Sequence, residues 1–308
     1  MSTATVVCIG VATLDAIVEL DRLPGRDERV SASDGRLAGG GVAATSAVTL
    51  ARLGVPAAIV GRVGNDAAGR WIRDDLAGAG VDVGGLRHGP GRSPVSVVLV
   101  ERGSGGRALA PYGGDNGPIE LDDTDLERCR AAAWVHVDHF GVDVARALRA
   151  AGVATPISFD GGVDVPGLDL GAIDLYAPTE VALLARLPGL GLAEAMAAAL
   201  AEGPSTVVVT RGADGSAALD RAAADVTFAG AFPIDADRGS TLGAGDVFHG
   251  ALLAGLVEGR SLPQALVRAN ACAGLACRAI DGRSAIPSAP ELDAYLAAHA
   301  REVADARS

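Results

Sequence analysis

Short apolar runs alternate along the chain with longer stretches rich in alanine and leucine. The short runs predict buried strands, because a strand covered on both faces is apolar at almost every position. Strands are expected at 5–11, 57–61, 133–137, 156–159, 173–176 and 206–210. The longer stretches predict helices, the clearest at 42–53, 67–79, 243–258 and 262–279. This alternation favours right-handed crossovers, so we expect an α/β fold whose mainly parallel sheet is covered by helices on both faces.

Two segments, about 16–37 and 92–119, break this rhythm, since they alternate apolar and polar residues between Gly/Pro turns. In the second segment, the runs 94–101 and 107–110 flank the turn Gly103–Gly106 and predict a hairpin. Strands of this kind do not belong to a doubly wound parallel core. We therefore expect a small antiparallel β sheet at one edge, suited equally to closing over a substrate and to contacting a second copy of the chain.

The sequence contains no low-complexity linker, so we expect a single α/β domain over residues 1–300 with a polar tail at 301–308. Residues 1–7 lack the basic start of a signal peptide, and no uncharged apolar run reaches the roughly 18 residues of a membrane span. The four cysteines have no C-x-x-C spacing. These features favour a cytoplasmic protein with free thiols.

The 308 residues are 49% hydrophobic and carry a formal charge of −12, and all 26 basic residues are arginine. Without lysine there is no Schiff-base chemistry, no lysine-containing phosphate loop and no strand lysine of a protein kinase. The acidic balance is poorly suited to nucleic-acid binding, which relies on a basic surface. Arginine can still form local anion sites, so small anionic substrates stay open.

The stretch 240–248, Ser-Thr-Leu-Gly-Ala-Gly-Asp-Val-Phe, carries the clearest chemistry. Small residues at the start of a long helix leave backbone N–H groups accessible, so Gly243, Ala244 and Gly245 predict an anion hole. Asp246 in the first turn is then placed to take a proton from an attacking hydroxyl, which suits phosphoryl transfer. An ordinary capped helix start has the same composition, so this stretch alone leaves both interpretations open.

The motif Gly-Ala-Gly-Asp at 243–246 also resembles the second signature of the ribokinase-like (PfkB) carbohydrate kinases. The other motifs that carry the resemblance follow the family's order, and they are Gly10–Asp15 after the first strand, Gly39–Gly41 at a helix start, Val60–Gly69, Thr210–Gly215, and Asn270 within Arg268–Ala271. The resemblance spans about residues 5–290, and the ordered motifs together are far more specific than any one of them.

The resemblance implies a Rossmann-like sheet of about eight or nine strands with a β lid. It implies transfer of a phosphoryl group from ATP with Mg²⁺ to a primary alcohol of a small sugar, with Asp246 as general base and Gly243–Gly245 as anion hole. The implied sugar site holds Asp15, Gly40 and Gly41, and the implied nucleotide site holds Thr210, Gly212, Gly215 and Asn270. It also implies a homodimer formed through the lid.

Three positions depart from the family pattern. Ser240 replaces the aspartate that helps to form a monovalent-cation site, which argues against potassium activation. Thr45 replaces an asparagine at the sugar site and has less reach, so sugar recognition is expected to differ. The motif that organises water around Mg²⁺ is present only as Pro178–Ala182, where Glu180 is the candidate to hold the metal through water.

The expected acceptor is a ketose or a pentose. Residues 41–48, 245–252 and 282–287 resemble bacterial kinases of modified ketoses such as sulfofructose, but no arginine follows the strand 133–137 to hold a sulfonate. Asp138 and His139 stand there instead and are predicted to line the sugar pocket. A nucleoside kinase and a non-catalytic sugar- or nucleotide-binding regulator remain alternatives. Arg107 and Arg211 are the arginines expected near the ATP phosphates.

Overall fold

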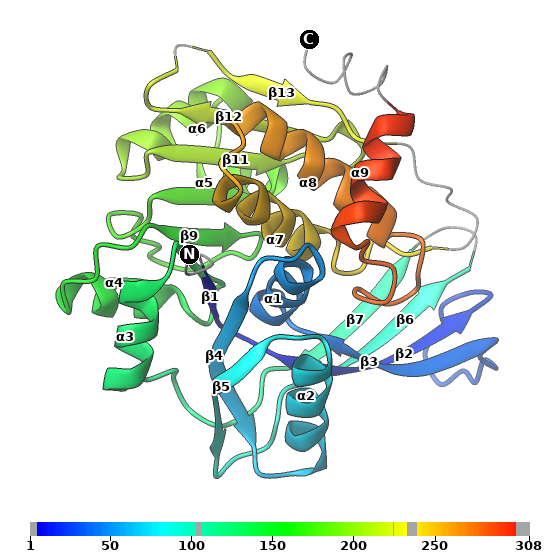
Figure 1. Ribbon diagram of the computed structural model, residues 1–308. Coiled ribbons are helices and arrows are strands. Elements are labelled where there is room, and N and C mark those ends of the chain that lie inside the picture. Colours follow the sequence, from blue (N-terminus) through cyan, green and yellow to red (C-terminus); the bar gives the residue numbers. More distant parts are fainter. Residues whose placement is uncertain (1–4, 103–105, 224, 233–238, 300–308) are drawn as a thin grey trace.

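The predicted strands assemble into a nine-stranded sheet in the computed structural model, which describes residues 5–102, 106–223, 225–232 and 239–299 (Figure 1). Seven strands are parallel, and only β12 and β13 run antiparallel to their neighbours. In spatial order the strands are β13 (Thr227–Ala229), β12 (Ser216–Asp220), β11 (Thr206–Thr210), β10 (Leu175–Pro178), β9 (Ile157–Gly161), β8 (Trp134–Val137), β1 (Val6–Ile9), β4 (Ala57–Gly64) and β5 (Asp82–Gly89).

Helices cover both faces of this sheet, as predicted. On one face lie α1 (Val42–Arg52), α2 (Ala67–Gly78), α7 (Ala244–Val257), α8 (Leu262–Ala276) and α9 (Ala289–Ala298). On the other lie α3 (Asp123–Ala131), α4 (Val142–Ala150), α5 (Glu180–Arg186) and α6 (Leu192–Ala201). The strand β1 shows why its sequence is apolar throughout. Its residues Val6 and Cys8 pack into the first layer, whereas Val7 and Ile9 pack into the second.

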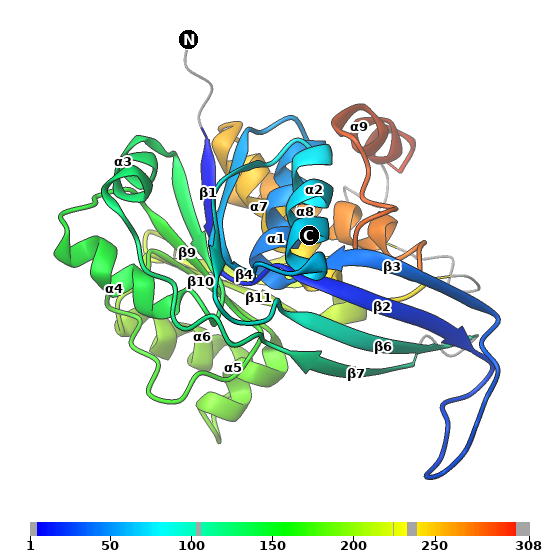
Figure 2. The same ribbon diagram turned by 90° about the horizontal axis from the view of Figure 1, so that it is seen from below.

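A second sheet of four strands projects from the edge of the first (Figure 2). Its order is β3 (Asp34–Gly40), β2 (Thr13–Leu20), β6 (Val95–Glu101) and β7 (Arg107–Tyr112). We call it the lid. The outer pairs β2–β3 and β6–β7 are antiparallel, as predicted. The central pair β2–β6 is parallel, because these strands follow β1 and β5, which run in the same direction in the main sheet.

The sequence patterns did not predict β5, β12, β13, α3, α4, α5, α6 or α9 as individual elements. The segment of β5 contains three glycines and little apolar periodicity, so it lacks the signal of a buried strand. The lid strands also extend beyond the expected limits, since β2 begins at Thr13 and β3 ends at Gly40. Part of the predicted turn Gly103–Gly106 and the predicted tail 301–308 lie outside the described residues.

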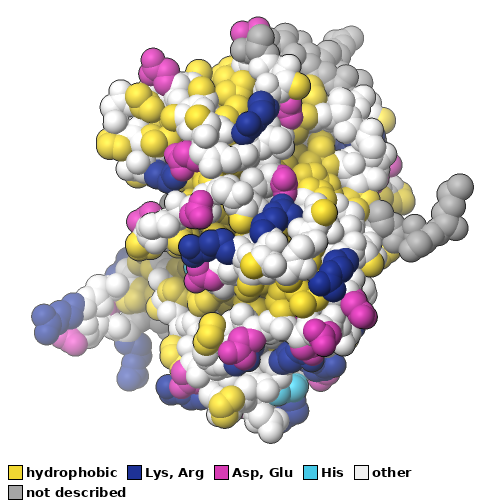
Figure 3. All heavy atoms as spheres, turned by 90° about the vertical axis from the view of Figure 1, so that its left-hand side faces the viewer, with side chains coloured by type: hydrophobic (Ala, Val, Ile, Leu, Met, Phe, Trp, Pro, Cys, Tyr) yellow, Lys and Arg dark blue, Asp and Glu magenta, His cyan; other side chains and the backbone are white. Residues whose placement is uncertain are grey.

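Arginine and acidic side chains are interspersed over the left-hand face of the molecule (Figure 3). This distribution agrees with the frequent Arg–Asp and Arg–Glu pairs of the structure, such as Arg128 with Asp82 and Arg146 with Asp143. Within the part of the chain that the structure describes, every helix is too short or too polar to cross a lipid bilayer.

Candidate active site

Two helix starts meet at the centre of the candidate site, because α1 and α7 pack closely against each other. A Cβ atom at Gly250 would lie 2.6 Å from the carbonyl oxygen of Ser46, so only glycine permits this approach. The Ser46 hydroxyl donates a 2.9 Å hydrogen bond to the carbonyl oxygen of Asp246. The glycine turn before α1 and the first turn of α7 are therefore held in a fixed relation.

The start of α7 has open backbone amides near the predicted anion hole, slightly further along the chain than Gly243–Gly245. Gly243 has a left-handed φ of 72°, and the N–H of Ala244 donates to the carbonyl oxygen of Thr241 at 3.3 Å. Among the described residues, the N–H groups of Gly245 and Asp246 have no acceptor. The space beside Gly245 is open, since a Cβ there would meet no atom within 4 Å. Those two amides can receive an anion.

Asp246 is half-buried beside these amides. Burial raises the pKa of its carboxyl to about 7, and the negative charge of Asp160 adds to the increase. A carboxyl with this pKa is ionised in a large fraction of molecules at neutral pH and still has high affinity for a proton. This is the property that a general base for a hydroxyl group needs.

A buried pair lies behind this base. The Nε2 atom of His249, one turn after Asp246, lies 3.1 Å from Oδ2 of Asp160 at the end of β9. Burial alone would lower the pKa of His249, but Asp160 raises it above the usual value. His249 therefore positions the Asp160 carboxylate, whose charge raises the pKa of Asp246. Asp160 was not identified from the sequence. Its position at the carboxyl end of a parallel strand is a signal that was available there.

His136 extends this cluster. Its ring lies 5.8 Å from that of His249, and its Nδ1 atom is 2.8 Å from the hydroxyl of Ser158. Burial lowers the pKa of His136 to about 3, so the ring is neutral. Its buried Nε2 atom has no partner among the described residues.

Asp15 lies against the glycine turn before α1, where the sequence predicted the sugar site. Its Oδ1 atom accepts a 2.6 Å hydrogen bond from the Thr13 hydroxyl, and burial raises its pKa. A Cβ at Gly40 would lie 2.0 Å from Oδ2 of Asp15, so the carboxyl group reaches the turn only because residue 40 is glycine. Gly41, with φ of 91°, completes the turn into α1.

Asp138 is fully buried, and its oxygens are already occupied. Oδ2 accepts from the N–H groups of Val11 and Ala43, and Oδ1 accepts from those of Phe140 and Gly141, at 2.8–3.2 Å. These bonds tie the loop after β1 to the start of α1. Direct contact of Asp138 with a sugar therefore stays a prediction, while its role in positioning the site is visible.

Thr45 and His139 occupy different surroundings. The hydroxyl of Thr45 is buried and accepts a 3.1 Å hydrogen bond from Nε of Arg283. The ring of His139 is half-buried and lies 4.5 Å from that of Phe140. Sequence reasoning placed Arg283 only within a stretch of family resemblance and gave it no role.

The predicted nucleotide-side residues gather where β11, β12 and β13 meet α8. Gly215 has a φ of 84°, and a Cβ there would lie 2.1 Å from the carbonyl oxygen of Ala229. The side-chain amide of Asn270 donates to the carbonyl oxygens of Ala229 and Gly230 at 2.9 and 3.0 Å. Thr210 ends β11, and Gly212 opens the short turn that follows. Asn270 thus shapes the wall of this region through the backbone.

Glu180 and Arg211, expected at the metal and at the phosphates, form an ion pair of 3.1 Å between Nε and Oε2. Mg²⁺ in nucleotide sites keeps several waters and needs only one or two carboxylates besides the phosphates, so a partly exposed Glu180 fits the predicted contact through water. The N–H of Ser240 donates to the carbonyl oxygens of Cys277 and Ala279, both at 3.0 Å.

The lid brings one arginine close to the start of α7. Nη1 of Arg107 on β7 contacts the hydroxyl of Thr241, two residues before the N-cap of α7. This is the side of the site where the sequence predicted an arginine near ATP phosphates. A lid arginine, open helix amides and a carboxyl with a raised pKa define the class of the site. It is suited to transferring a phosphoryl group to a hydroxyl.

Comparison with known proteins identifies the family. The model of the pfkB family of carbohydrate kinases matches residues 3–157 and 172–289. Ribokinase from Arabidopsis thaliana is 33% identical over 315 residues, covering 94% of this chain and 79% of that protein. The ATP-dependent ribose-1-phosphate kinase of Halopiger xanaduensis is 33% identical over 297 residues, covering 95% and 97%.

The structure of Arabidopsis thaliana ribokinase complexed with ribose and ATP has the same fold. It superposes with a TM-score of 0.80 at 30% identity and covers 96% of this chain and 99% of its own. The chain belongs to the PfkB family of carbohydrate kinases, and it is a ribokinase-like, ATP-dependent sugar kinase.

Replacing the carboxyl group of Asp246 tests the base. In Asp246→Asn, turnover should fall about 10²- to 10⁴-fold, because no group accepts the hydroxyl proton, while nucleotide affinity is kept. In the wild type, kcat/KM should rise with pH through about 7. Steady-state kinetics between pH 5 and 9 measure both effects, and near-wild-type turnover of the variant would exclude Asp246 as the base.

The same variant should be more stable than the wild type at pH 8. The carboxyl of Asp246 is held protonated in the fold up to a pKa of about 7 but ionises near pH 4 when unfolded, so the wild type loses stability between these values. The gain in melting temperature should therefore be small at pH 4 and full above pH 7. A gain that does not depend on pH would contradict the raised pKa.

Asp160→Asn should move the acid limb of the kcat/KM profile to lower pH. Asp160 is the strongest charge that raises the pKa of Asp246, and the opposing effect of His249 is smaller. The profile of kcat/KM against pH is the measurement, with Asp169→Asn on an exposed loop as a control. An unchanged or more alkaline limb would show that Asp160 does not tune the base.

Proposed function

We propose that this enzyme transfers the γ-phosphoryl group of ATP to a primary hydroxyl of a small neutral sugar, a pentose or a ketose. The observation that carries the proposal is the position of Asp246. Its carboxyl lies next to the open amides of Gly245 and Asp246, in a helix packed against the glycine turn that contacts Asp15. A carboxyl with a raised pKa, open helix amides and a second carboxylate beside one glycine turn support this proposal.

The reaction then follows from the positions of these groups. Asp246 takes the proton of the sugar hydroxyl as its oxygen forms a bond to the γ-phosphorus, and the bond to the bridging oxygen of ADP breaks. The amides of Gly245 and Asp246 donate to the oxygens on which negative charge is concentrated, and Arg107 adds a positive charge from the lid. Glu180 would hold Mg²⁺ through water, and the bound metal would neutralise phosphate charge.

The charges around the glycine turn favour a neutral acceptor. Arg283 is paired with Asp75 at 2.9 Å, and Arg36 is paired with Asp34 and Asp281. The hydrogen-bond partners of Asp15 are the hydroxyl groups of Thr13 and Ser96. Arg283, which also attracts Asp15, is paired with Asp75, so Asp15 presents a carboxylate to the acceptor. A sugar hydroxyl can donate to it, whereas a sugar phosphate would be repelled. The charge of Asp15 therefore favours a neutral sugar over ribose 1-phosphate, the acceptor in the name of the Halopiger xanaduensis relative.

A substrate panel tests this preference. Magnesium-dependent ADP release should give a kcat/KM for a neutral pentose or ketose at least about tenfold above that for ribose 1-phosphate, for fructoselysine and for nucleosides. A preference for ribose 1-phosphate would contradict the charge argument, and a preference for nucleosides would contradict the sugar assignment. Stabilisation by these ligands without any turnover would instead support a non-catalytic regulator.

The lid supports the proposal of a homodimer. Its face away from the cleft has no charged side chain in two successive rows across the four strands, by the register of the strand pairs. The rows are Leu37–Ala16–Val97–Ala110 and Gly35–Val18–Leu99–Ala108. Leu37 and Val97 are 59% and 50% exposed. A second copy would cover this face with an equivalent apolar face.

Val97→Glu should convert the dimer to a monomer, because a buried unpaired carboxylate opposes association. Sedimentation velocity at equal protein concentrations measures the change. Val181→Glu is the matched control, since Val181 on α5 is 80% exposed and lies away from the lid. A monomeric wild type, or a Val97→Glu variant that stays dimeric, would exclude this interface.

We further propose that the enzyme works in the cytoplasm. All four cysteines, Cys8, Cys129, Cys272 and Cys277, are buried free thiols, as expected in a reducing compartment.

A further inference from the structure

A buried arginine supports the acceptor site from behind. Arg283 is 8% exposed and lies in the loop after α8. Its guanidinium donates to three acceptors from separate elements. These are the carbonyl oxygen of Gly40 at 2.5 Å, the hydroxyl of Thr45 at 3.1 Å and Oδ2 of Asp75 at 2.9 Å. One planar group thus joins the end of β3, the first turn of α1 and α2.

The glycine turn is shaped around this arginine. A Cβ at Gly39 would lie 2.1 Å from Nη1 of Arg283 and 2.3 Å from Oδ2 of Asp75. Gly39 therefore leaves room for the ion pair on one side of the strand, while Gly40 leaves room for Asp15 on the other. The position of the turn therefore depends on Arg283 and Asp75 on one side and on Asp15 on the other.

The contact with Thr45 is a second reason to assign Arg283 a role in acceptor binding. Its hydroxyl is 2% exposed and accepts from Arg283, so this short side chain is held by the arginine and does not extend into the cleft. The arginine consequently fixes the first turn of α1, the element that carries the acceptor side of the site. The backbone of the same loop also touches α7, since a Cβ at Gly243 would lie 2.9 Å from Cα of Gly282.

The loop of Arg283 is linked to the lid as well. The carboxylate of Asp281 accepts from the N–H groups of Arg283 and Ser284 at 2.9 and 2.7 Å, and from Nη1 of the lid residue Arg36 at 3.3 Å. Ile280 packs into a small apolar cluster with the lid residues, which are Ile17, Val98 and Val100.

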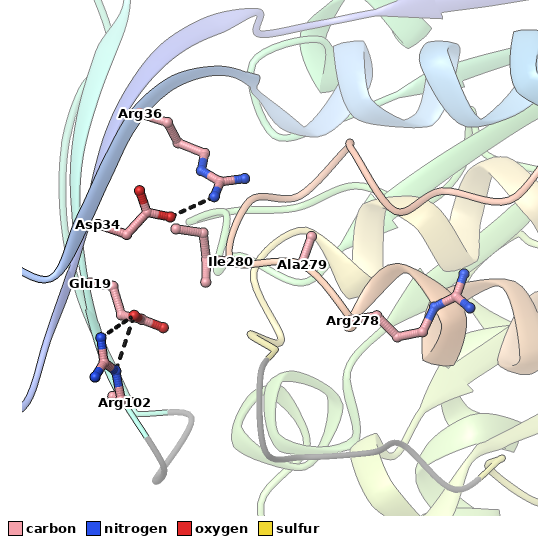
Figure 4. A pocket seen from close by; sticks show the side chains of 7 residues that line it. All are labelled: Glu19, Asp34, Arg36, Arg102, Arg278, Ala279 and Ile280. Atoms are coloured by element: carbon pink, nitrogen blue, oxygen red, sulfur yellow. Dashed lines mark hydrogen bonds and ion pairs between the residues drawn. The ribbon is translucent and has the colours of Figure 1, made fainter.

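Figure 4 shows Arg36 and Asp34 of the lid opposite Ala279 and Ile280, across a pocket of about 580 Å³. One wall of this pocket is the lid, and the other is the segment that leads into Asp281 and Arg283. A change in the position of the lid therefore acts directly on the loop that carries the arginine.

We propose that Arg283 is a positioning residue for the acceptor, which sets the Gly39–Gly41 turn and couples it to the lid through Asp281. The proposal rests on the proposed sugar kinase function and adds the residue that controls acceptor affinity. Among the described residues, the hydrogen bonds of Arg283 and Asp281 reach the acceptor turn and the lid but not Asn270 or Gly215, so nucleotide affinity should change less than acceptor affinity. Removal of the guanidinium should therefore affect the two substrates unequally.

Steady-state kinetics of Arg283→Ala test the proposal, with the sugar for which the wild-type enzyme has the highest kcat/KM. The acceptor KM should rise at least about tenfold with ATP KM nearly unchanged, because only the acceptor turn loses its support. Millimolar guanidinium should lower the acceptor KM of this variant again by filling the vacated space. Arg283→Lys should show an intermediate acceptor KM, since a point charge cannot bridge three acceptors in one plane.

Arg268→Ala is the matched control, because Arg268 is equally buried and is paired with Asp293 on α9. It should lose melting temperature with no change in acceptor KM and no response to guanidinium. Should Arg283→Ala fail to fold, Arg283→Lys and Asp281→Asn keep the test, since both should raise acceptor KM selectively.

Failure of the Arg283 proposal can be distinguished from failure of the proposed function. Turnover with an unchanged acceptor KM, or with equal increases in both KM values, overturns the role of Arg283 and leaves the sugar kinase function intact. A wild-type enzyme without turnover on any sugar overturns the proposed function, and the proposal about Arg283 falls with it.

Discussion

The candidate site depends on the close packing of α1 against α7. At Gly250 the helices approach until a side-chain carbon would lie 2.6 Å from the carbonyl oxygen of Ser46. Even one added methyl group in such a contact typically costs about 1–3 kcal/mol and moves the backbone. That movement would separate the glycine turn of the acceptor from the amides and carboxyl of α7. Catalysis by positioning requires these groups to be fixed before the substrates arrive, and this contact fixes them.

The charges of the site are arranged around the same contact. Burial and the negative charge of Asp160 raise the pKa of Asp246, whereas His249 lowers the pKa of Asp160 and keeps that carboxyl ionised. The fold thereby keeps a carboxyl with high proton affinity, at the expense of stability above neutral pH. Arginine, the only basic residue besides histidine in the sequence, suits the supporting role. The fork of Arg283 joins three elements through a carbonyl, a hydroxyl and a carboxylate, which the single charge of a lysine could not do.

How much of this could be predicted depends on the range of each interaction. The parallel strands such as β1 and β11 were predicted because burial on both faces makes them apolar at each position. Accessible amides at the start of α7 were predicted because they are a local property of the small residues at a helix start. The contacts of Arg283 were not, since Gly40 and Thr45 lie more than 230 residues away along the chain. No local pattern records such a contact, and only the folded chain shows it.

The two roles that the sequence left open for the lid, closure over a substrate and contact with a second copy, use opposite faces of its sheet. Successive residues of a strand point to opposite faces, so Asp15 and Ile17 face the cleft while Leu14 and Ala16 face away. The cleft side also carries Arg36 and is closed against Ile280, whereas the outer rows are apolar. Substrate closure and contact with a second copy therefore do not compete for the same side chains. A second copy on the outer face would hold the strands together as a unit. The lid would then move only as a whole about its base, and the contacts of Arg36 and Ile280 would transmit this motion to the loop of Arg283.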